Sequence, residues 1–405
     1  MERIINQKHS KETYLFTISK TFERISYYGM RSLLILYMTE SVLKMKTTDA
    51  FNIYGWFLFA LLFSKIIGAI IGDLFIGNKK AIILGGIIQA LGAFSFFIPS
   101  TAGLYTGLFL IILGSGLYSP NLFSNFGKIY LNKTKLLDAG FAIFYFGTNL
   151  GAFLAIISIG YIGEKYSWKF GFFILGLLML LSIIPIIISK DKKQLNNIKK
   201  NADNQMIMNI IIGLITVSLF WVIYSIGNIR ILDIQPIFFE NIESELLKKI
   251  WTYIDLSFII PISLIASVIW TYFYNNQFIK LTIGFIFGAI AFGILFLIPE
   301  IPTEKHMTIY FLAIFLLGIS EIHIAPILFS ILTKNSNPKY LAILISLSAI
   351  PIRLFNALIT FTFKGKLYKN PILSLKFALI SMIIVSIGLI IFIKWKKKKY
   401  LQQYI

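Results

Sequence analysis

Apolar runs of about 20 residues recur along this chain from end to end, and they restrict its fold more than any other feature. A helix of ~20 residues can cross the hydrocarbon core of a bilayer, whereas a membrane β-barrel shows shorter segments of alternating polarity. The composition agrees, because 57% of the residues are hydrophobic and only 14% are charged. The sequence therefore predicts an all-α protein that spans the membrane many times.

Hydropathy and segment length indicate about twelve spans. Lysine and arginine concentrate in every second connection, and the largest connection of the other set, about residues 228–250, also contains acidic residues. Because basic loops stay in the cytoplasm, we expect both termini there and place the protein in a bacterial-type inner membrane. The first run lacks a small-residue cleavage site, so we expect it to remain as a span and not to act as a signal peptide.

One polar stretch, rich in lysine and asparagine, interrupts the spans in mid-chain. We predict an N-terminal six-helix bundle at residues 1–189, a cytoplasmic linker at 190–205 and a C-terminal six-helix bundle at 206–405. Two six-span halves are typical of major facilitator transporters, whose substrate site lies near mid-membrane between the halves. The number of spans alone equally allows another twelve-span fold.

Charge and composition argue against several other kinds of function. The net charge of +20 is concentrated in lysines of short loops, so we attribute it to topology and predict no nucleic-acid partner. The chain has no cysteine, which excludes disulfides and thiolate chemistry, and its three histidines are scattered. We expect no metal or cofactor other than protons as a coupling ion. The expected partners are the lipid bilayer and a small substrate, with no obligatory protein partner.

The first predicted span, about residues 14–38, is charged on one face. At ~100° per residue, its polar side chains form a stripe about 140° wide. Each charge would cost several kcal/mol against lipid, so the stripe must face a polar cavity or pair internally. The stripe consists of Lys20, Glu23, Arg24, Tyr27, Tyr28 and Arg31.

A second charged motif follows the second predicted span, where residues 68–80 read GAIIGDLFIGNKK. We expect a loop in which glycines allow close helix approach and Asp73 pairs with a lysine or caps a neighbouring helix. The motif resembles the signature between spans two and three of the major facilitator superfamily. That resemblance implies a latch that stabilises a gate and does not contact substrate.

Four stretches together resemble the proton-dependent oligopeptide transporter (POT) family of that superfamily. They are similar to the family's first-helix signature, the end of its fourth helix, its fifth-helix motif and its tenth helix, in the right order. A weaker similarity to the eighth helix covers residues 255–270. The four stretches are FERISYYGMR (22–31), LYSPNLFSNFGKIY (117–130), FAIFYFGTNLG (141–151) and EIHIAPILFSILTKNSNP (321–338).

The resemblance implies import of di- and tripeptides with protons by alternating access, without enzymatic chemistry. A peptide needs a cation for its carboxylate, for which the arginine fork is suited, and an acid or amide for its amine. The expected substrate-binding residues are Tyr27, Tyr28 and Arg31 at the carboxylate, Asn149 and Glu321 at the amine, Trp221 in the cavity wall, and Asp255. The expected coupling or gating residues are Lys20, Glu23, Arg24, Lys65, Asp73 and Arg353.

The sequence departs from the family pattern at positions linked to proton coupling and gate ion pairs. Lys20 stands where the family has an acid, and Ser119 stands where it has a lysine. Losing an acid and its lysine partner together avoids leaving either buried and unpaired. We therefore expect coupling to be weakened or rerouted, with Glu23 and Glu321 as the titrating groups. Further departures are Ser225, Ile226, Leu62, Lys65 and Asp255.

Alternatives remain open for several residues and for the function. Glu23 can neutralise its neighbours in a purely structural network, Asn149 can serve helix packing, and Asp255 can be a helix-end residue. Lys65 can snorkel, and His323 is expected to pack in the wall. The alternative functions are transport of another small solute, such as an amino acid, nitrate or a drug, and a membrane-embedded transferase. The short loops argue against the transferase.

Overall fold

The computed structural model describes all residues except 1, 4–6, 42, 166, 191–202, 240–244, 364 and 404–405. The chain forms two compact units. The N-terminal unit comprises Lys8–Ala202 and Leu332–Leu347, and the C-terminal unit comprises Met1–Gln7, Asp203–Ile331 and Ser348–Ile405. The predicted linker at 190–205 lies largely outside the described residues, so the predicted domain bounds stay a prediction.

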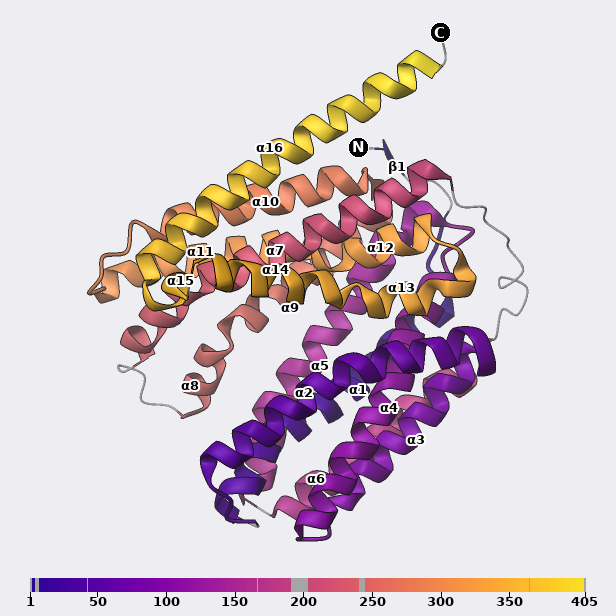
Figure 1. The fold of residues 1–405 in the computed structure, drawn as a ribbon, viewed down its shortest axis with the longest axis vertical. Coiled ribbons are helices and arrows are strands. Elements are labelled where there is room, and N and C mark those ends of the chain that lie inside the picture. The colour runs from indigo at the N-terminus through magenta and orange to yellow at the C-terminus, as the bar shows by residue number, and fades with distance from the viewer. Residues whose placement is uncertain are drawn as a thin grey trace. The chain divides into compact units, whose positions relative to one another are not determined.

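The N-terminal unit is a bundle of long helices (Figure 1). Within it, α3 packs against α4 and α6, α1 packs against α5 and α6, and α2 packs against α4. Its elements are α1 (Lys11–Leu36), the π-helix η1 (Tyr37–Ser41), α2 (Thr47–Ile70), the π-helix η2 (Ile71–Ile76), α3 (Asn78–Ser95), α4 (Thr101–Lys128), η3 (Thr134–Leu136), α5 (Leu137–Lys165), α6 (Trp168–Ile188), η6 (Pro338–Tyr340) and α13 (Leu341–Leu347).

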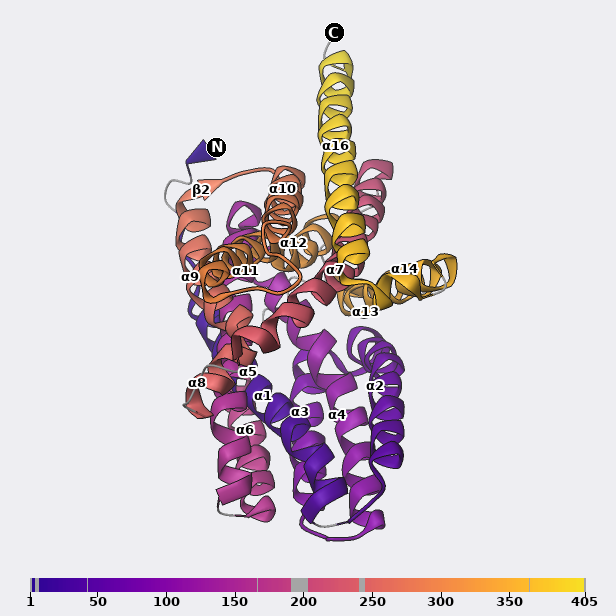
Figure 2. The ribbon, with the colours of Figure 1, turned by 90° about the vertical axis from the view of Figure 1, so that its left-hand side faces the viewer.

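The C-terminal unit is also mainly helical. In it, α10 packs against α11 and α16, α7 packs against α16 and α14, and α9 packs against α11. The C-terminal part of α16 extends beyond α10 (Figure 2). Its elements are β1 (Glu2–Arg3), α7 (Asn204–Phe239), α8 (Glu245–Thr252), α9 (Ile254–Tyr272), β2 (Phe273–Tyr274), which pairs antiparallel with β1, α10 (Gln277–Leu295), η5 (Glu304–His306), α11 (Met307–Ile322), α14 (Ala349–Thr362), α15 (Lys366–Lys369) and α16 (Pro371–Gln403). Helix α12 (Ala325–Asn335) has residues in both units.

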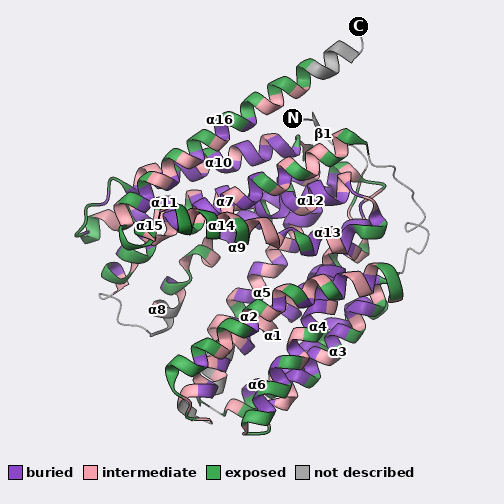
Figure 3. Ribbon diagram, viewed as in Figure 1, coloured by how far each residue is buried: buried purple, intermediate pink, exposed green. Residues whose placement is uncertain are grey.

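Ten helical segments of the described chain are long and apolar enough to cross a membrane. Helices α1 and α3, of 26 and 18 residues, are not among them. The reason is local polarity, because α1 carries the charged stripe and α3 begins with Asn78, Lys79 and Lys80. Adding these two helices gives the predicted number of about twelve. Many large apolar residues are exposed, as lipid contact requires, and exposed residues occur on most of the long helices (Figure 3).

Close backbone contact holds α2 against α4. A Cβ atom on Gly68 would collide with the backbone of Gly116, and one on Gly116 would collide with Ser64. Only glycine lets two helices approach this closely. Gly68, the first residue of the motif at 68–80, therefore serves helix packing.

Two predicted connections are largely helical. The prediction of a loop at 68–80 was wrong for most of that range. Helices α2 and η2 continue to Ile76, and only Gly77, at φ 85°, leaves helical geometry. The expected connection at about 228–250 was wrong at its start, since α7 continues to Phe239 and α8 follows at Glu245–Thr252. The charged Arg230 does not end α7. Its side chain is buried and is paired with Asp233 and the Ile298 carbonyl.

Candidate functional site

A buried ion triad forms the first half of the charged stripe on α1. Lys20 Nζ lies 3.0 Å from Glu23 Oε2, and Arg24 donates to both oxygens of Glu23 at 2.6 and 2.5 Å. The side chains of Lys20 and Glu23 are 1% and 0% exposed. Two cations against one carboxylate leave one positive charge in excess. The stripe is therefore partly paired internally, as its position in a span requires.

The second half of the stripe stacks guanidinium groups on tyrosine rings. The Arg24 guanidinium lies 4.8 Å from the Tyr27 ring centroid, and that of Arg31 lies 5.7 Å from both Tyr27 and Tyr28. The two tyrosine rings meet edge to face at 5.5 Å. Cation–π contacts of this kind contribute ~0.5–2 kcal/mol each. They hold Arg31 in place without neutralising its charge.

Tyr54 on α2 completes this group, although the sequence analysis did not select it. Arg31 Nε donates to the Tyr54 hydroxyl at 2.5 Å, and the ring centroid lies 5.6 Å from the guanidinium. Within the described part of the chain, Arg31 pairs with no acid, in contrast to Arg24. The remaining N–H groups of Arg31 suit a carboxylate from outside the protein.

Lys65 adds to the positive charge of this region. It follows Tyr54 by eleven residues, which places both side chains on the same side of α2 at ~100° per residue. Its charge acts on that of Lys20. The structure thus brings Lys65 near the stripe, and the expected coupling or gating role stays a prediction.

Helix α5 fits tightly against the stripe. Thr21 donates to the Gly147 carbonyl at 3.0 Å, and a Cβ atom on Gly151 would lie 2.5 Å from the Thr21 carbonyl oxygen. On the same helix, the buried Asn149 donates to the Tyr145 carbonyl at 2.9 Å. That bond stays within α5 and does not join two helices. The expected role of Asn149 at a substrate amine remains a prediction.

Asp73 joins four helical segments of the N-terminal unit. Its carboxylate accepts from Asn78 of α3 at 2.9 Å and from the backbone N–H of Ile343 in α13 at 3.0 Å. Lys128, at the end of α4, lies 3.9 Å away and donates to Asn78 at 2.6 Å. Ile343 lies in the first turn of its helix, where backbone N–H groups lack helical partners and attract an acid. The geometry is that of a latch on the start of α13.

In the C-terminal unit, several predicted site residues gather around Tyr224. The Trp221 ring lies 5.7 Å from the Tyr224 ring, and both Glu321 and Asp255 act electrostatically on the Tyr224 hydroxyl. Tyr224 lies within the LFWVIY stretch that contains Trp221, but the sequence analysis did not single it out. A tyrosine in an apolar helix has no distinguishing sequence signal.

Glu321 lies where the tenth predicted span breaks. Helix α11 ends at Ile322 and α12 begins at Ala325. Pro326 accounts for the break, because proline cannot donate to the carbonyl four residues earlier and its ring crowds the preceding turn. His323, in the gap, bonds the Ile319 carbonyl through Nδ1 at 2.8 Å and packs edge-on against Trp270. The expectation that His323 packs in the wall of the cavity stays a prediction.

Asp255 and Arg353 both lie at exposed positions of the C-terminal unit. Asp255 is in the first turn of α9, directly after α8, and its side chain is exposed. This position fits the helix-end alternative. Arg353 is exposed on α14 and has no ion pair within the described part of its unit. Its predicted gating role stays a prediction.

Arg230 is a buried cation that the sequence analysis missed. It donates to Asp233 at 2.6 Å and to the carbonyls of Ile298 and Pro299 at 3.0 and 2.8 Å. The side chain is 1% exposed. It fastens the chain that follows α10 to α7, so its role is structural.

In the described residues, no three histidine or acidic side chains come together as a metal site requires. The expectation that the protein needs no cofactor stays a prediction.

The family model of the POT family matches residues 79–254. The chain is 33% identical over 213 residues to the uncharacterized transporter YclF of Bacillus subtilis (strain 168), which covers 51% of this chain and 42% of YclF. It is 32% identical over 174 residues to the peptide transporter YePEPT of Yersinia enterocolitica, covering 41% of this chain and 34% of that protein. The matched part is thus less than half the length of these two relatives.

Solved structures match nearly the whole chain. A POT family transporter in complex with 5-aminolevulinic acid has a TM-score of 0.65 at 20% identity, covering 96% of this chain and 98% of that one. A POT family transporter in complex with a thioalcohol-conjugated peptide has a TM-score of 0.63 at 20% identity, covering 94% and 96%. These similarities confirm the predicted fold, an all-α membrane protein with the major facilitator architecture.

Proposed function

We propose that this chain is a member of the POT family and that it carries di- and tripeptides across the membrane by alternating access. In this mechanism, two helical bundles rock around a central site and no covalent chemistry occurs. We place the protein in the inner membrane with both termini in the cytoplasm, in line with the positive-inside pattern. We favour transport over the transferase alternative, because the similar proteins are named as transporters.

The observation that carries this proposal is the state of Arg31. Tyr27, Tyr28 and Tyr54 hold its guanidinium, and no acid of the described chain neutralises it. Fixing a charged fork in a partly buried position without a counter-ion is costly unless a ligand supplies that counter-ion. A peptide carboxylate fits because it accepts two parallel N–H bonds from one guanidinium. Asn149, Trp221, Asp255 and Glu321 are our candidates for the rest of the peptide.

We further propose that protons couple through Glu321 and not through Glu23. Both oxygens of Glu23 are bonded by cations, so protonating it would break two buried ion pairs. Glu321 lies at a helix break, where its charge acts on Tyr224. One titrating acid in place of two gives weaker coupling than the family signature implies. Lys20 is therefore the residue that removes Glu23 from the proton pathway.

A second candidate is a small solute that is not a peptide but carries both a carboxylate and an amine. The excess positive charge around Lys20, Lys65 and Arg31 supports any substrate with an exposed carboxylate. One structural neighbour was solved with 5-aminolevulinic acid, which has both groups. Competition of this compound with a peptide would separate the two candidates.

The test is uptake of labelled dialanine into proteoliposomes with and without an inward proton gradient. We expect saturable uptake that the gradient increases, and we expect Glu321→Gln to abolish the increase while retaining exchange of internal for external dialanine. Glu23→Asp serves as the comparison, because it keeps the carboxylate. Absence of any dialanine uptake or exchange by the folded protein would refute the peptide assignment. Full gradient-driven accumulation in Glu321→Gln would refute the coupling route only.

A further inference from the structure

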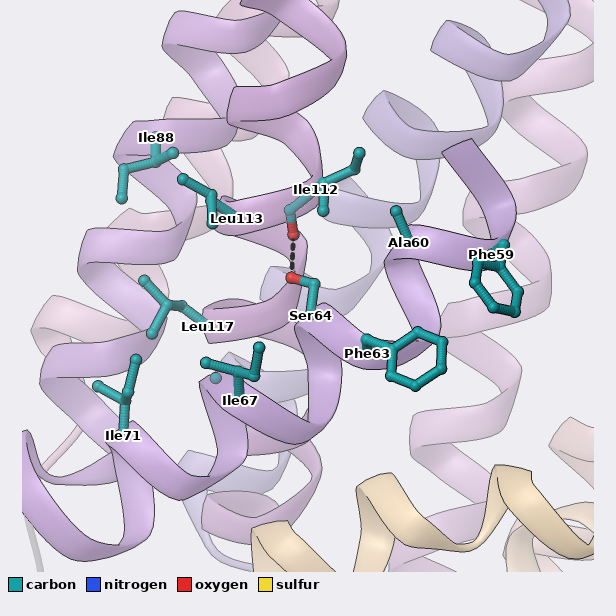
Figure 4. A pocket seen from close by; sticks show the side chains of 11 residues that line it. Phe59, Ala60, Phe63, Ser64, Ile67, Ile71, Ile88, Ile112, Leu113 and Leu117 are labelled. Carbon is teal, nitrogen blue, oxygen red and sulfur yellow. Dashed lines mark hydrogen bonds between the residues drawn. The ribbon is translucent and has the colours of Figure 1, made fainter. Parts of the chain in front are cut away.

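A groove on the outer wall of the N-terminal unit is separate from all the residues assigned above. Its volume is about 460 Å³, which lies within the ~300–1,000 Å³ range of small-molecule sites. Side chains of α2, the start of η2, α3 and α4 line it (Figure 4). The side chains that define its walls are Phe59, Phe63 and Ile67 of α2, Ile88 of α3, and Leu113 and Leu117 of α4.

The groove offers a ligand no charged or free polar group. Among the described residues that line it, Ser64 has the one hydroxyl, and it donates to the Ile112 carbonyl (Figure 4). A polar or ionised ligand group placed here would lose water without gaining a partner, which costs several kcal/mol. The ligand that fits is therefore an apolar chain.

The groove lies on the side of α2 that faces away from the charged stripe. At ~100° per residue, the middle of its α2 lining is more than ~120° from Tyr54 and Lys65. An occupant would thus contact the back of the helix whose other side presents Tyr54 to Arg31. It would not enter the candidate substrate site.

The dimensions of the groove match one leaflet of a bilayer. Its α2 lining extends from Phe59 to Ile71, which is ~18 Å at 1.5 Å per residue, close to the ~15 Å half-thickness of the hydrocarbon core. Trp56 is 71% exposed next to Phe59, with 5.7 Å between ring centroids. In the topology proposed above, however, Trp56 lies inside the span Thr47–Ile76, and the end of the groove near the membrane surface is at Ile71, on the cytoplasmic side.

Within the described part of the N-terminal unit, no other element covers the groove. Phe59, Phe63 and Ile67 are 54%, 49% and 59% exposed. In a protein that spans the membrane, lipid surrounds such outward apolar side chains. A cavity with the length of a leaflet and an apolar lining is suited to a lipid tail.

We propose that this groove binds one acyl chain of a membrane phospholipid, aligned along α2 with its headgroup at the Ile71 end. The chain fills the space between α2 and α4 beside the close contact of Gly68 and Gly116. It thereby stabilises the packing of α2 just before the segment that carries Asp73. The inference does not depend on the identity of the transported substrate.

The experiment uses the full chain, reconstituted with a trace of phospholipid that carries a photoreactive diazirine in one acyl chain. Mass spectrometry of the irradiated protein then compares labelling at two matched isoleucines. Ile67 lines the groove and is 59% exposed, whereas Ile265 of α9 is outside it and 58% exposed. We expect preferential labelling at Ile67, and we expect unlabelled phospholipid to compete more strongly than the same concentration of an alkyl detergent.

Two variants place a larger side chain in the groove. Ala60→Trp and Leu113→Trp should each abolish the preferential labelling at Ile67 and leave that at Ile265 unchanged. Both change partly or fully exposed positions, and thermal unfolding identifies which variant is folded. Equal labelling of the two isoleucines in the unmodified protein would overturn the proposal, because it would indicate bulk lipid only. Equal competition by detergent, or preferential labelling that persists in a folded groove-filling variant, would also overturn it.

Discussion

Lys20 and Glu23, one turn apart on α1, form an ion pair of 3.0 Å in which neither side chain is more than 1% exposed. Glu23 also binds Arg24, so it balances two buried cations. We predict that Glu23→Gln lowers the free energy of unfolding by ~3–5 kcal/mol, because it leaves both cations without a counter-charge. Lys20→Met should cost less, since Glu23 keeps Arg24. Thermal unfolding in detergent measures both changes.

The control for this comparison is Lys339→Met, at an exposed position in the same unit. We expect the double variant Lys20→Met/Glu23→Gln to be more stable than Glu23→Gln alone, because it removes one of the unpaired cations. Equal destabilisation by Lys20→Met and Glu23→Gln would show that Glu23 does not act as the common partner.

Removing the Asp73 carboxylate should release the start of α13. Its bond to the Ile343 N–H joins residues 270 positions apart in the chain. A hydrogen bond to a charged group contributes ~1.5–3 kcal/mol, and ~1.4 kcal/mol corresponds to a factor of ten. In Asp73→Ala we therefore expect amide hydrogen exchange at Ile343 to be ~10-fold faster or more. Asp73→Asn should give a smaller increase, and exchange in α16 should not change.

Arg31→Lys should weaken dialanine transport although it keeps the charge. Lysine cannot form two parallel bonds to a carboxylate, so we expect KM to rise ~10-fold, the effect of ~1.4 kcal/mol. Tyr54→Phe removes only the bond to Arg31 Nε and should raise KM by ~2–10-fold. Tyr105→Phe, at an exposed position of α4, is the control. An unchanged KM in Arg31→Lys would argue against a carboxylate contact at Arg31.

His9 should make the stability of the N-terminal unit depend on pH. It shares a 2.7 Å hydrogen bond with the Tyr130 hydroxyl, and burial together with Lys133 holds the pKa of His9 below its ordinary value of 6.5. The folded state therefore favours neutral His9, while the unfolded state takes up a proton as pH falls. Stability is complete above pH 6.5 and is lost as pH decreases from 6.5 through the lower pKa of the folded state.

Thermal unfolding measured between pH 5 and pH 8 tests this prediction, with the range set about the ordinary histidine pKa of ~6.5. His9→Gln should flatten the acidic decrease in unfolding temperature. His306→Gln, in the C-terminal unit, is the control. The same acidic decrease in His9→Gln and the unmodified protein would assign the effect to other groups.

The sequence predicted the charged stripe but not how its charges divide. Spacing on α1 placed Lys20, Glu23, Arg24 and Arg31 on one side, because helical periodicity is a local property. It did not show that Glu23 pairs with two neighbours and leaves Arg31 to tyrosines. That division depends on which side chains reach one another and on a partner from another helix. The stripe therefore has a structural half, in which Glu23 pairs with its neighbours, and a candidate binding half around Arg31.

Two of the residues that the sequence analysis missed share one property. Tyr54 and Tyr224 are tyrosines in apolar helices, where they have the same appearance as interfacial or packing residues. Tyr54 is hydrogen-bonded to Arg31 in one unit, and Tyr224 is under the electrostatic influence of Glu321 and Asp255 in the other. Arg230 fell within the connection expected at about 228–250, and the structure instead pairs it with Asp233 and two carbonyls.

The sequence by itself determined that this is a membrane protein of many helical spans, and its short motifs indicated a resemblance to one transporter family. Hydropathy, helical period and motif spacing are properties of neighbouring residues, so they can be read along the chain. Only the tertiary structure decided that Tyr54 holds Arg31, that Asp73 holds α13 and that the back of α2 forms a groove. Each of these depends on close packing between helices that are distant in the sequence, which no local pattern records.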